Sequence, residues 1–185
     1  GYWRREGFKG HELFGQTIGI IGVGRLGRKV AGFAHAFGMN ILGYDTNPER
    51  IPDYVSLASS IEELMEKSDV VSLHIHATLK NHKLFSAKLL SHMHAGSLLI
   101  NTSRGELVDE DALVALLKMN KIAGYAADVV ANECSESKSP LQKYAMHAPQ
   151  NLLLTPHLGG YTWESRQKAE IFMAEKFLKL KLGQG

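Results

Sequence analysis

The sequence predicts an α/β fold built on a doubly wound parallel sheet. Short aliphatic and β-branched runs recur along the chain, and segments with apolar residues at helical spacing separate them. Strands and helices that alternate in this way form parallel sheets, because each helix carries the chain back before the next strand begins. Glycines at G-x-G-x-x-G spacing, within "IIGVGRLGRKVAGFAHAFG", place a tight turn between the first strand and the first helix.

Six strands and five helices are expected in order. The strands are residues 17–22, 40–45, 69–76, 96–102, 124–130 and 151–156, and the helices are residues 25–37, 61–67, 86–93, 109–121 and 163–180. Gly38 is a natural stop for the first helix, and Ser86 is placed to cap the third. Acids open the helix at 109–121 and a lysine lies near its end, as the helix dipole favours.

These elements divide the chain into three regions. Residues 1–15 are polar and punctuated by glycine, which indicates an arm or linker, and residues 16–160 form one α/β domain. In residues 161–185 the apolar Ile171, Ala174, Phe177 and Leu178 recur at helical spacing, which predicts a helix packing on the domain or returning from it. The chain starts at Gly1 without a methionine, so we expect a piece of a longer protein.

Composition narrows the classes of function. The formal net charge is only +2 and the positive charges are scattered, which argues against a nucleic-acid partner. No apolar run approaches the ~20 residues of a membrane span, and no signal peptide pattern opens the chain. A single cysteine, Cys134, excludes an internal disulfide and suits a reducing, cytoplasmic compartment.

The glycine turn has the pattern of a dinucleotide-binding site. Gly22 allows the tight turn, Gly24 lets the backbone approach a pyrophosphate, and Gly27 lets helix and strand pack closely. The free N–H groups around Arg25 and Leu26 would then face the anion. The glycine pattern alone also fits a purely structural turn. The residues that follow it are therefore needed to distinguish a binding site from a structural turn.

Asp45 supplies the second element of the pattern. It comes after the second strand, 18 residues beyond Gly27, where a carboxylate can accept hydrogen bonds from the ribose hydroxyls of the adenosine. By itself Asp45 could be an ordinary residue of a turn at a strand end. Together with the glycines it indicates a Rossmann-like site for NAD, because its charge would repel the 2′-phosphate of NADP.

Three later strand ends carry polar side chains of a different kind. Arg104 comes after the fourth strand, Asp128 and Glu133 after the fifth, and His157 after the sixth. An arginine can hold a carboxylate through two parallel hydrogen bonds. An Arg, a Glu and a His that converge on one crevice would suit a 2-oxo or 2-hydroxy acid, although each alone is more commonly a surface residue.

The motifs resemble those of the NAD-binding domain of the D-isomer-specific 2-hydroxyacid dehydrogenases. The resemblance rests on "GVGRLG" with Asp45, "NTSRGELVDEDAL", "AADVVANE" and "TPHLGG", and it covers nearly the whole chain. It implies that Arg104 binds substrate, His157 is the acid/base and Glu133 its partner. It implies that Asp128 holds the nicotinamide carboxamide and that further residues line the cofactor: Ile75, Thr102, Ser103, Gly159 and Gly160.

The sequence departs from the family pattern at two places. Cys134 and His76 stand where the family usually has proline, with Ala77 and Thr78 after His76. Cys134 lies next to Glu133, but a role as nucleophile is disfavoured. The period-two pairs His74 with His76 and His92 with His94 could chelate a metal, but no cysteine or carboxylate cluster completes a tetrahedral set, so no metal site is predicted.

The resemblance also implies a second domain that closes over the cofactor cleft. Without it we expect weak or moderate NAD binding and poor turnover. The family forms homodimers through its NAD-binding domains, with the arm near Trp3 involved, so a homodimer is expected. Two other functions stay open: a regulatory, corepressor-type NAD-binding module of the same family, and a related NAD enzyme such as an adenosylhomocysteine hydrolase or alanine dehydrogenase. The motifs "NTSRGELVDEDAL" and "TPHLGG" count against the last.

Overall fold

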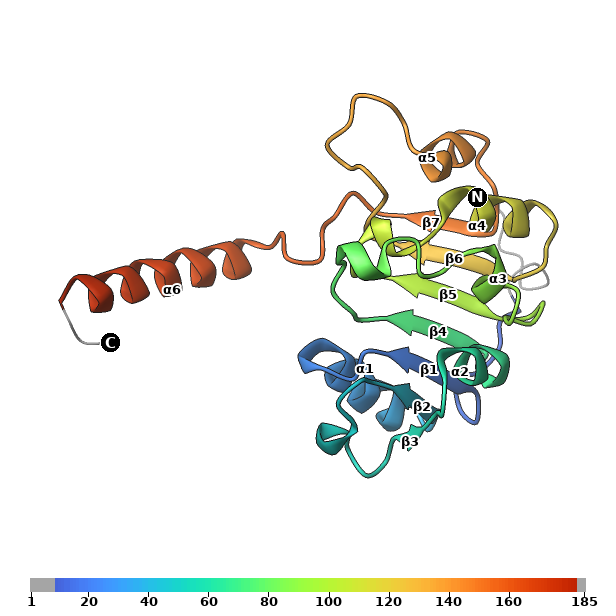
Figure 1. Ribbon diagram of the computed structural model, residues 1–185, viewed down its shortest axis with the longest axis horizontal. Coiled ribbons are helices and arrows are strands. Elements are labelled where there is room, and N and C mark those ends of the chain that lie inside the picture. Colours follow the sequence, from blue (N-terminus) through green and yellow to red (C-terminus); the bar gives the residue numbers. More distant parts are fainter. Residues whose placement is uncertain (1–8, 183–185) are drawn as a thin grey trace.

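The computed structural model describes residues 9–182 and contains one seven-stranded sheet (Figure 1). Its strands are β1 (Thr17–Ile21), β2 (Asn40–Tyr44), β3 (Ser56–Leu57), β4 (Val70–Leu73), β5 (Leu98–Asn101), β6 (Gly124–Ala127) and β7 (Leu152–Leu154). All neighbouring strands are parallel, in the order β3-β2-β1-β4-β5-β6-β7. The predicted α/β fold with a parallel sheet is confirmed.

Six helices and three short 3-10 turns connect the strands. The helices are α1 (Arg25–Ala36), α2 (Ile61–Lys67), α3 (Ala87–Leu90), α4 (Glu110–Lys118), α5 (Pro140–Ala145) and α6 (Trp163–Lys181), and the turns are η1 (Pro48–Arg50), η2 (Leu79–Asn81) and η3 (Gly105–Leu107). Gly38, at φ +71°, ends α1 as expected. Ser86 does occupy the N-cap of α3, but its side chain makes no capping hydrogen bond.

The structure adds two elements to those expected from the sequence. Strand β3 has only two exposed residues, too few for a periodic pattern. Helix α5 lies in a segment for which no helix or strand is expected above. A signal for its start does exist, because Ser139 and Gln142 form a capping box around Pro140 at the first turn.

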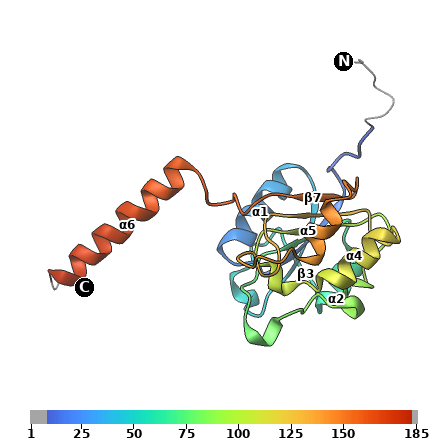
Figure 2. The same ribbon diagram turned by 90° about the horizontal axis from the view of Figure 1, so that it is seen from above.

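Alternate residues of the strands contribute side chains to two separate hydrophobic cores. Ile20 packs with Ala31 and Ala34 of α1 on one face of the sheet. Ile21 belongs to the other core, to which α2, α3, α4 and α5 contribute buried side chains such as Leu64 and Leu113. The sheet is therefore wound on both faces, with α1 on one side and the other four helices opposite (Figure 2).

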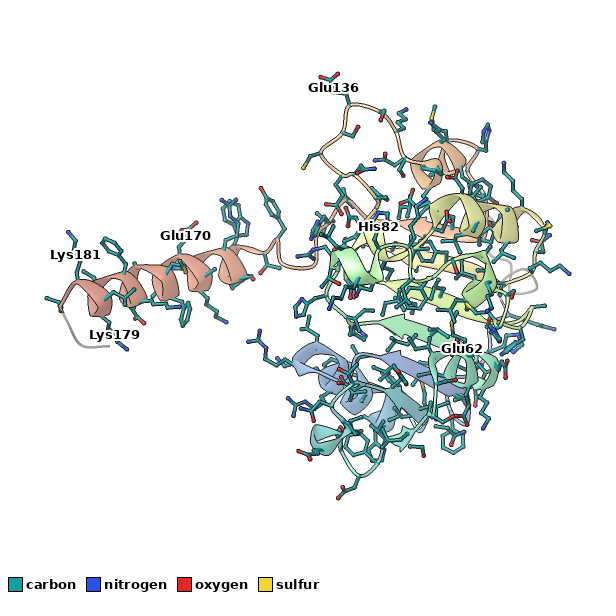
Figure 3. All side chains as sticks on the ribbon, viewed as in Figure 1. Glu62, His82, Glu136, Glu170, Lys179 and Lys181 are labelled. Carbon is teal, nitrogen blue, oxygen red and sulfur yellow. The ribbon has the colours of Figure 1, made fainter. Side chains whose placement is uncertain are left out.

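Helix α6 does not pack on the domain. It projects away from the sheet in both views (Figures 1 and 2), and every one of its residues is exposed. Figure 3 shows the side chains of Glu170, Lys179 and Lys181 standing free along it. Among the described residues its apolar side chains, including Ile171 and Phe177, have no facing partner. That the helix packs on the domain or returns from it stays a prediction.

The remaining expectations concern the arm at the start of the chain, the dimer contact near Trp3 and the absence of a membrane span. Residues 9–15 have no helix or strand and are exposed, in keeping with an arm. Trp3, which the resemblance places near a dimer contact, lies outside the described residues. Within residues 9–182, no helix combines the length and the apolarity needed to cross a membrane.

Candidate active site

The predicted functional residues meet at one edge of the sheet. Because all strands are parallel, their carboxyl ends point the same way, to the edge from which α6 departs in Figure 1. The chain winds outward in one direction from β1 to β3 and in the other from β4 to β7, so the winding reverses between β1 and β4. Ligands of open α/β sheets bind at such a switch point.

The glycine turn after β1 requires its glycines at two positions. Gly22 has φ +92°, and a Cβ there would lie 2.7 Å from the carbonyl oxygen of His74. A Cβ on Gly27 would lie 2.1 Å from the carbonyl oxygen of Gly22, which no side chain permits. Gly24 differs, because a Cβ there would meet no atom within 4 Å. Open space next to its backbone is what a closely approaching ligand needs.

Helix α1 begins without the usual caps. Its N-cap is Gly24, it receives no side-chain capping bond, and its first turn holds no acid. The side chains of Ser60 and Asp109, by contrast, cap α2 and α4. Uncapped N–H groups and the positive end of the helix dipole attract an anion. The start of α1, at Arg25 and Leu26, therefore fits a pyrophosphate.

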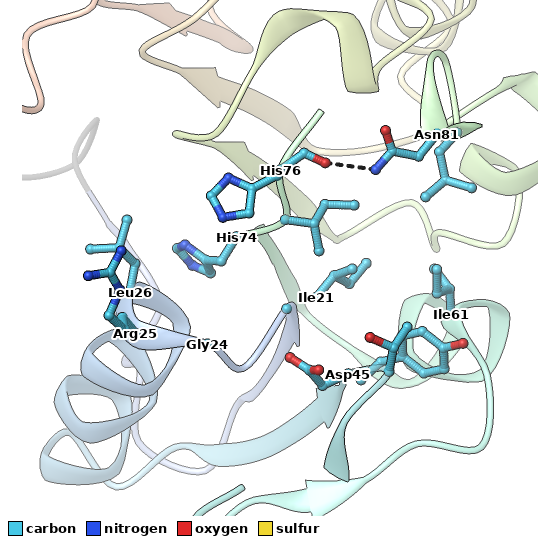
Figure 4. Close-up of a pocket in the computed structure, with 14 residues that line it drawn as sticks. Ile21, Gly24, Arg25, Leu26, Asp45, Ile61, His74, His76 and Asn81 are labelled. Atoms are coloured by element: carbon cyan, nitrogen blue, oxygen red, sulfur yellow. Dashed lines mark hydrogen bonds between the residues drawn. The ribbon is translucent and has the colours of Figure 1, made fainter. Parts of the chain in front are cut away.

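Asp45 is held rigidly at the end of β2. Its Oδ2 accepts the N–H of Val23 at 2.8 Å and its Oδ1 accepts the N–H of Asn47 at 2.8 Å. Each oxygen keeps a lone pair for a further donor such as a ribose hydroxyl. The carboxylate lines a hollow of about 560 Å³ (Figure 4), which Gly22, Gly24, Arg25, Leu26 and Ile75 also line.

A second hollow, of about 840 Å³, continues from the first across the switch point. The two share Leu26, His74, Ile75 and His76, and the second extends to Thr102, Ser103 and Arg104 after β5. Ser103 is fixed there by a 2.7 Å hydrogen bond from its Oγ to the carbonyl of Leu73. These four shared residues join the two hollows into one groove along the strand ends.

His157 and Glu133 form a close pair beyond β7. The His157 Nδ1 lies 2.7 Å from the Glu133 Oε2, and the two side chains are 48% and 33% exposed. The backbone of His157 has φ +54°, in the left-handed region. Its N–H donates to the carbonyls of Asp128 and Thr155, at 2.9 and 3.1 Å, which holds this unusual conformation in place.

Comparison with known proteins decides the family. Residues 1–159 match the family described as D-isomer specific 2-hydroxyacid dehydrogenase, NAD binding domain. The chain belongs to this family. The sequence resemblance is thereby confirmed, and so is the prediction of an NAD-binding domain.

Individual relatives in this family differ in their substrates. The chain is 36% identical over 187 residues to D-3-phosphoglycerate dehydrogenase of Methanocaldococcus jannaschii, covering 100% of this chain and 34% of the relative. It resembles D-lactate dehydrogenase of Aquifex aeolicus, solved with NAD and lactic acid, at TM-score 0.86 and 31% identity, covering 99% and 59%. It also resembles an acyclic imino acid reductase solved with NADPH and D-Arg, at TM-score 0.82 and 33% identity, covering 97% and 55%. The chain thus spans about one third to three fifths of these proteins.

Within this dehydrogenase domain, Asp128 organises the loop that carries His157. Its carboxylate accepts hydrogen bonds from the Thr155 hydroxyl and from the N–H groups of Leu158 and Gly159, the last two at 2.8 Å. Burial raises the pKa of Asp128, but these hydrogen bonds and the nearby His157 outweigh it and lower the pKa overall. The Oδ2 atom keeps a lone pair, so the predicted contact to a carboxamide stays open. Gly160 is exposed.

Arg104 is placed apart from the His157–Glu133 pair. It lines the second hollow, whereas His157, Glu133 and Cys134 line a third hollow of about 480 Å³. Its guanidinium donates to the neighbouring Ser103 carbonyl at 2.6 Å and is otherwise exposed. The three predicted catalytic residues therefore share an edge of the sheet, but only two of them touch.

Two buried residues that position this edge were not predicted from the sequence. Asn101 is fully buried and its Nδ2 donates to the Arg104 carbonyl at 2.9 Å. Glu110 is also buried, and its carboxylate accepts the N–H groups of Ala131, at 2.6 Å, and Leu141, at 3.3 Å. The sequence did not predict this role of Glu110, because an acid in the first turn of a helix is already explained by the helix dipole.

In each histidine pair considered for metal binding, one ring has another partner. His92 Nδ1 lies 2.6 Å from a carboxylate oxygen of Glu66, and His74 Nε2 lies 2.9 Å from the Ser72 hydroxyl. Among residues 9–182, no three His, Cys, Asp or Glu side chains are grouped so as to hold a metal ion.

Proposed function

We propose that this domain serves an NAD-dependent enzyme that interconverts a 2-hydroxy acid and a 2-oxo acid. The observation that carries the proposal is the 2.7 Å contact between the His157 Nδ1 and the Glu133 Oε2 at the edge that holds the NAD groove. A histidine oriented by a carboxylate through one ring nitrogen is poised to exchange a proton through the other.

His157 is the residue that transfers the proton. Bound NAD(H) supplies or accepts the hydride at the substrate carbon. With Nδ1 engaged by Glu133, the His157 Nε2 gives its proton to the carbonyl oxygen during reduction and takes the hydroxyl proton during oxidation. The Glu133 carboxylate fixes the ring orientation and stabilises the imidazolium while it carries the proton.

Arg104 has the chemistry of a carboxylate clamp. Its guanidinium offers a planar set of donors that matches both oxygens of a carboxylate. A 2-oxo acid whose carboxylate meets Arg104 could turn its carbonyl oxygen toward His157, bridging the second and third hollows. The positive charge of Arg104 would also stabilise the negative charge that develops on that oxygen.

We expect the chain alone to work slowly. His157 and Arg104 are both exposed, so water competes for the substrate carboxylate and screens the charges that should act on the transition state. The chain also spans only part of its relatives' length. A homodimer and a cytoplasmic location remain predictions. The exposed Phe33 of α1 and Phe37 just after it support the dimer.

The test is reduction of a panel of 2-oxo acids with NADH at high protein concentration, with product measured by mass spectrometry. We expect slow turnover, which His157→Gln lowers on the order of 10²–10⁴-fold. His147→Gln, at another exposed histidine, is the matched control and should change nothing. Turnover that survives His157→Gln would contradict the assigned role. NADH binding without any turnover would favour the regulatory, corepressor-type module instead.

A further inference from the structure

The two main hollows meet at four residues, and one of them is unexpected. Leu26, His74, Ile75 and His76 line both the hollow at Asp45 and the hollow at Arg104. A dinucleotide with its adenosine ribose at Asp45 must therefore pass these residues to bring its nicotinamide to the far side. The middle of such a ligand is the pyrophosphate, which carries two negative charges. That unexpected residue is His76, which stands where the resembled family usually has proline.

The loop that carries His76 is fixed by a hydrogen bond. The His76 carbonyl accepts a hydrogen bond from the Asn81 Nδ2 at 2.8 Å, drawn as a dashed line in Figure 4. Asn81 itself is held by the capping box of η2 with Thr78. The His76 side chain is exposed. Figure 4 shows its ring turned toward the start of α1, where Arg25 and Leu26 lie.

The charged and titratable groups around His76 are mostly cationic or neutral. Arg25 comes from α1, His74 from the end of β4, His82 from beyond η2, and Arg104 and Glu106 from the segment after β5. Burial lowers the pKa of His74 and so favours its neutral form, and its Nε2 is engaged with the Ser72 hydroxyl. Asp45 lies at the far end of the first hollow, where the ribose is expected.

We propose that His76 is a second phosphate contact of the bound dinucleotide, facing the uncapped start of α1 across the pyrophosphate. The inference rests on NAD occupying the groove as proposed above. Histidine is the side chain that gains charge between pH 8 and pH 5. A protonated imidazole makes a charge-assisted contact with a phosphate oxygen, so we expect NADH binding that tightens as the pH falls.

The experiment measures the dissociation constant of NADH by nicotinamide fluorescence at pH 6.0 and pH 8.5. For the unsubstituted chain we expect binding about fivefold tighter at pH 6.0, the size of one exposed charge-assisted contact. His76→Asn should remove most of this difference. His76→Lys carries a charge at both pH values and should bind tightly at both. His147→Asn is the matched control, because His147 is exposed and lines neither hollow, and it should keep the pH dependence.

A second probe locates the contact on the ligand. His76→Asn should weaken binding of ADP at pH 6.0 and leave adenosine unaffected, because only ADP carries the diphosphate. A pH dependence unchanged by His76→Asn, or an equal loss for adenosine and ADP, would overturn the inference. Failure of the unsubstituted chain to bind NADH at either pH would overturn the proposed function and the inference together. Those outcomes are distinct, so the two proposals can fail separately.

Discussion

The two halves of the sheet edge that carries the predicted site residues are built in different ways. The half at β1, β2 and β4 is built on backbone turns, with Val23 only 2% exposed and Asp45 held by two backbone N–H groups. The half at β5, β6 and β7 consists of exposed side chains on longer loops, including Arg104, Glu133 and His157. We infer from this difference that cofactor binding is complete within this chain, whereas catalysis depends on what covers the second half.

The contacts that hold the key residues in place differ in the same way. We call the half at β1, β2 and β4 the cofactor half and the half at β5, β6 and β7 the catalytic half. In the cofactor half, Gly22, Gly27 and Asp45 are fixed by neighbours that directly follow the ends of β1 and β4. In the catalytic half, a loop of irregular structure carries Glu133 and is tied down at a distance by the buried Glu110. Loops held by a few side chains open more easily than strand ends. We therefore expect substitutions in the cofactor half to affect folding as well as binding.

Gly27→Ala offers the largest test of that expectation. A Cβ 2.1 Å from the Gly22 carbonyl oxygen forces the turn and α1 apart. Overpacking of this kind costs about 1–3 kcal/mol, so Tm should fall by several degrees, at about 2–4 °C for each kcal/mol in a domain of this size. NADH binding should weaken too. Thermal unfolding and fluorescence titration of the same samples measure both.

Gly32→Ala is the control within the same helix. A Cβ there would lie 3.7 Å from the Tyr54 hydroxyl, an ordinary contact. Alanine stabilises a helix interior by up to about 1 kcal/mol relative to glycine, so Tm should stay level or rise and NADH affinity should not change. A Gly27→Ala variant as stable as Gly32→Ala would contradict the expectation that substitutions in the cofactor half affect folding as well as binding.

Asp128→Asn probes the catalytic half and should have a smaller, pH-dependent effect. The folded-state pKa of Asp128 is lowered from its ordinary value of 3.8, so the ionised carboxylate stabilises the folded chain above that value. This contribution is lost as the pH falls through the lowered pKa. The wild type should therefore have the higher Tm at pH 7, with the difference shrinking by pH 3. Asp53→Asn, at an exposed residue, is the control. An Asp128→Asn deficit as large at pH 3 as at pH 7 would contradict this account.

Strand topology makes much of the site predictable from the sequence. Once the strands are parallel, their ends must share an edge, so Gly22, Asp45 and Arg104 could be brought together without coordinates. The pairing of His157 with Glu133 was predicted only from the family resemblance. The two residues are 24 positions apart, and no sequence pattern predicts a contact over that separation.

Other features escaped prediction for physical reasons. The partners of Glu110 and Asn101 include backbone groups of other segments, and no sequence pattern marks such contacts. Strand β3 is too short for a pattern. The periodicity of α6 marks an apolar face but cannot show whether a partner covers it.

The most direct test of the central claim is an NADH titration of this chain and of Asp45→Ala. We predict saturable binding that Asp45→Ala weakens about tenfold or more, because the ribose hydroxyls lose a charged acceptor. Asp53→Ala should bind as the unsubstituted chain does, and NADPH should bind the unsubstituted chain more weakly than NADH. Folded protein that binds no NADH, or an Asp45→Ala variant with unchanged affinity, would contradict the claim that the cofactor half is complete in this chain.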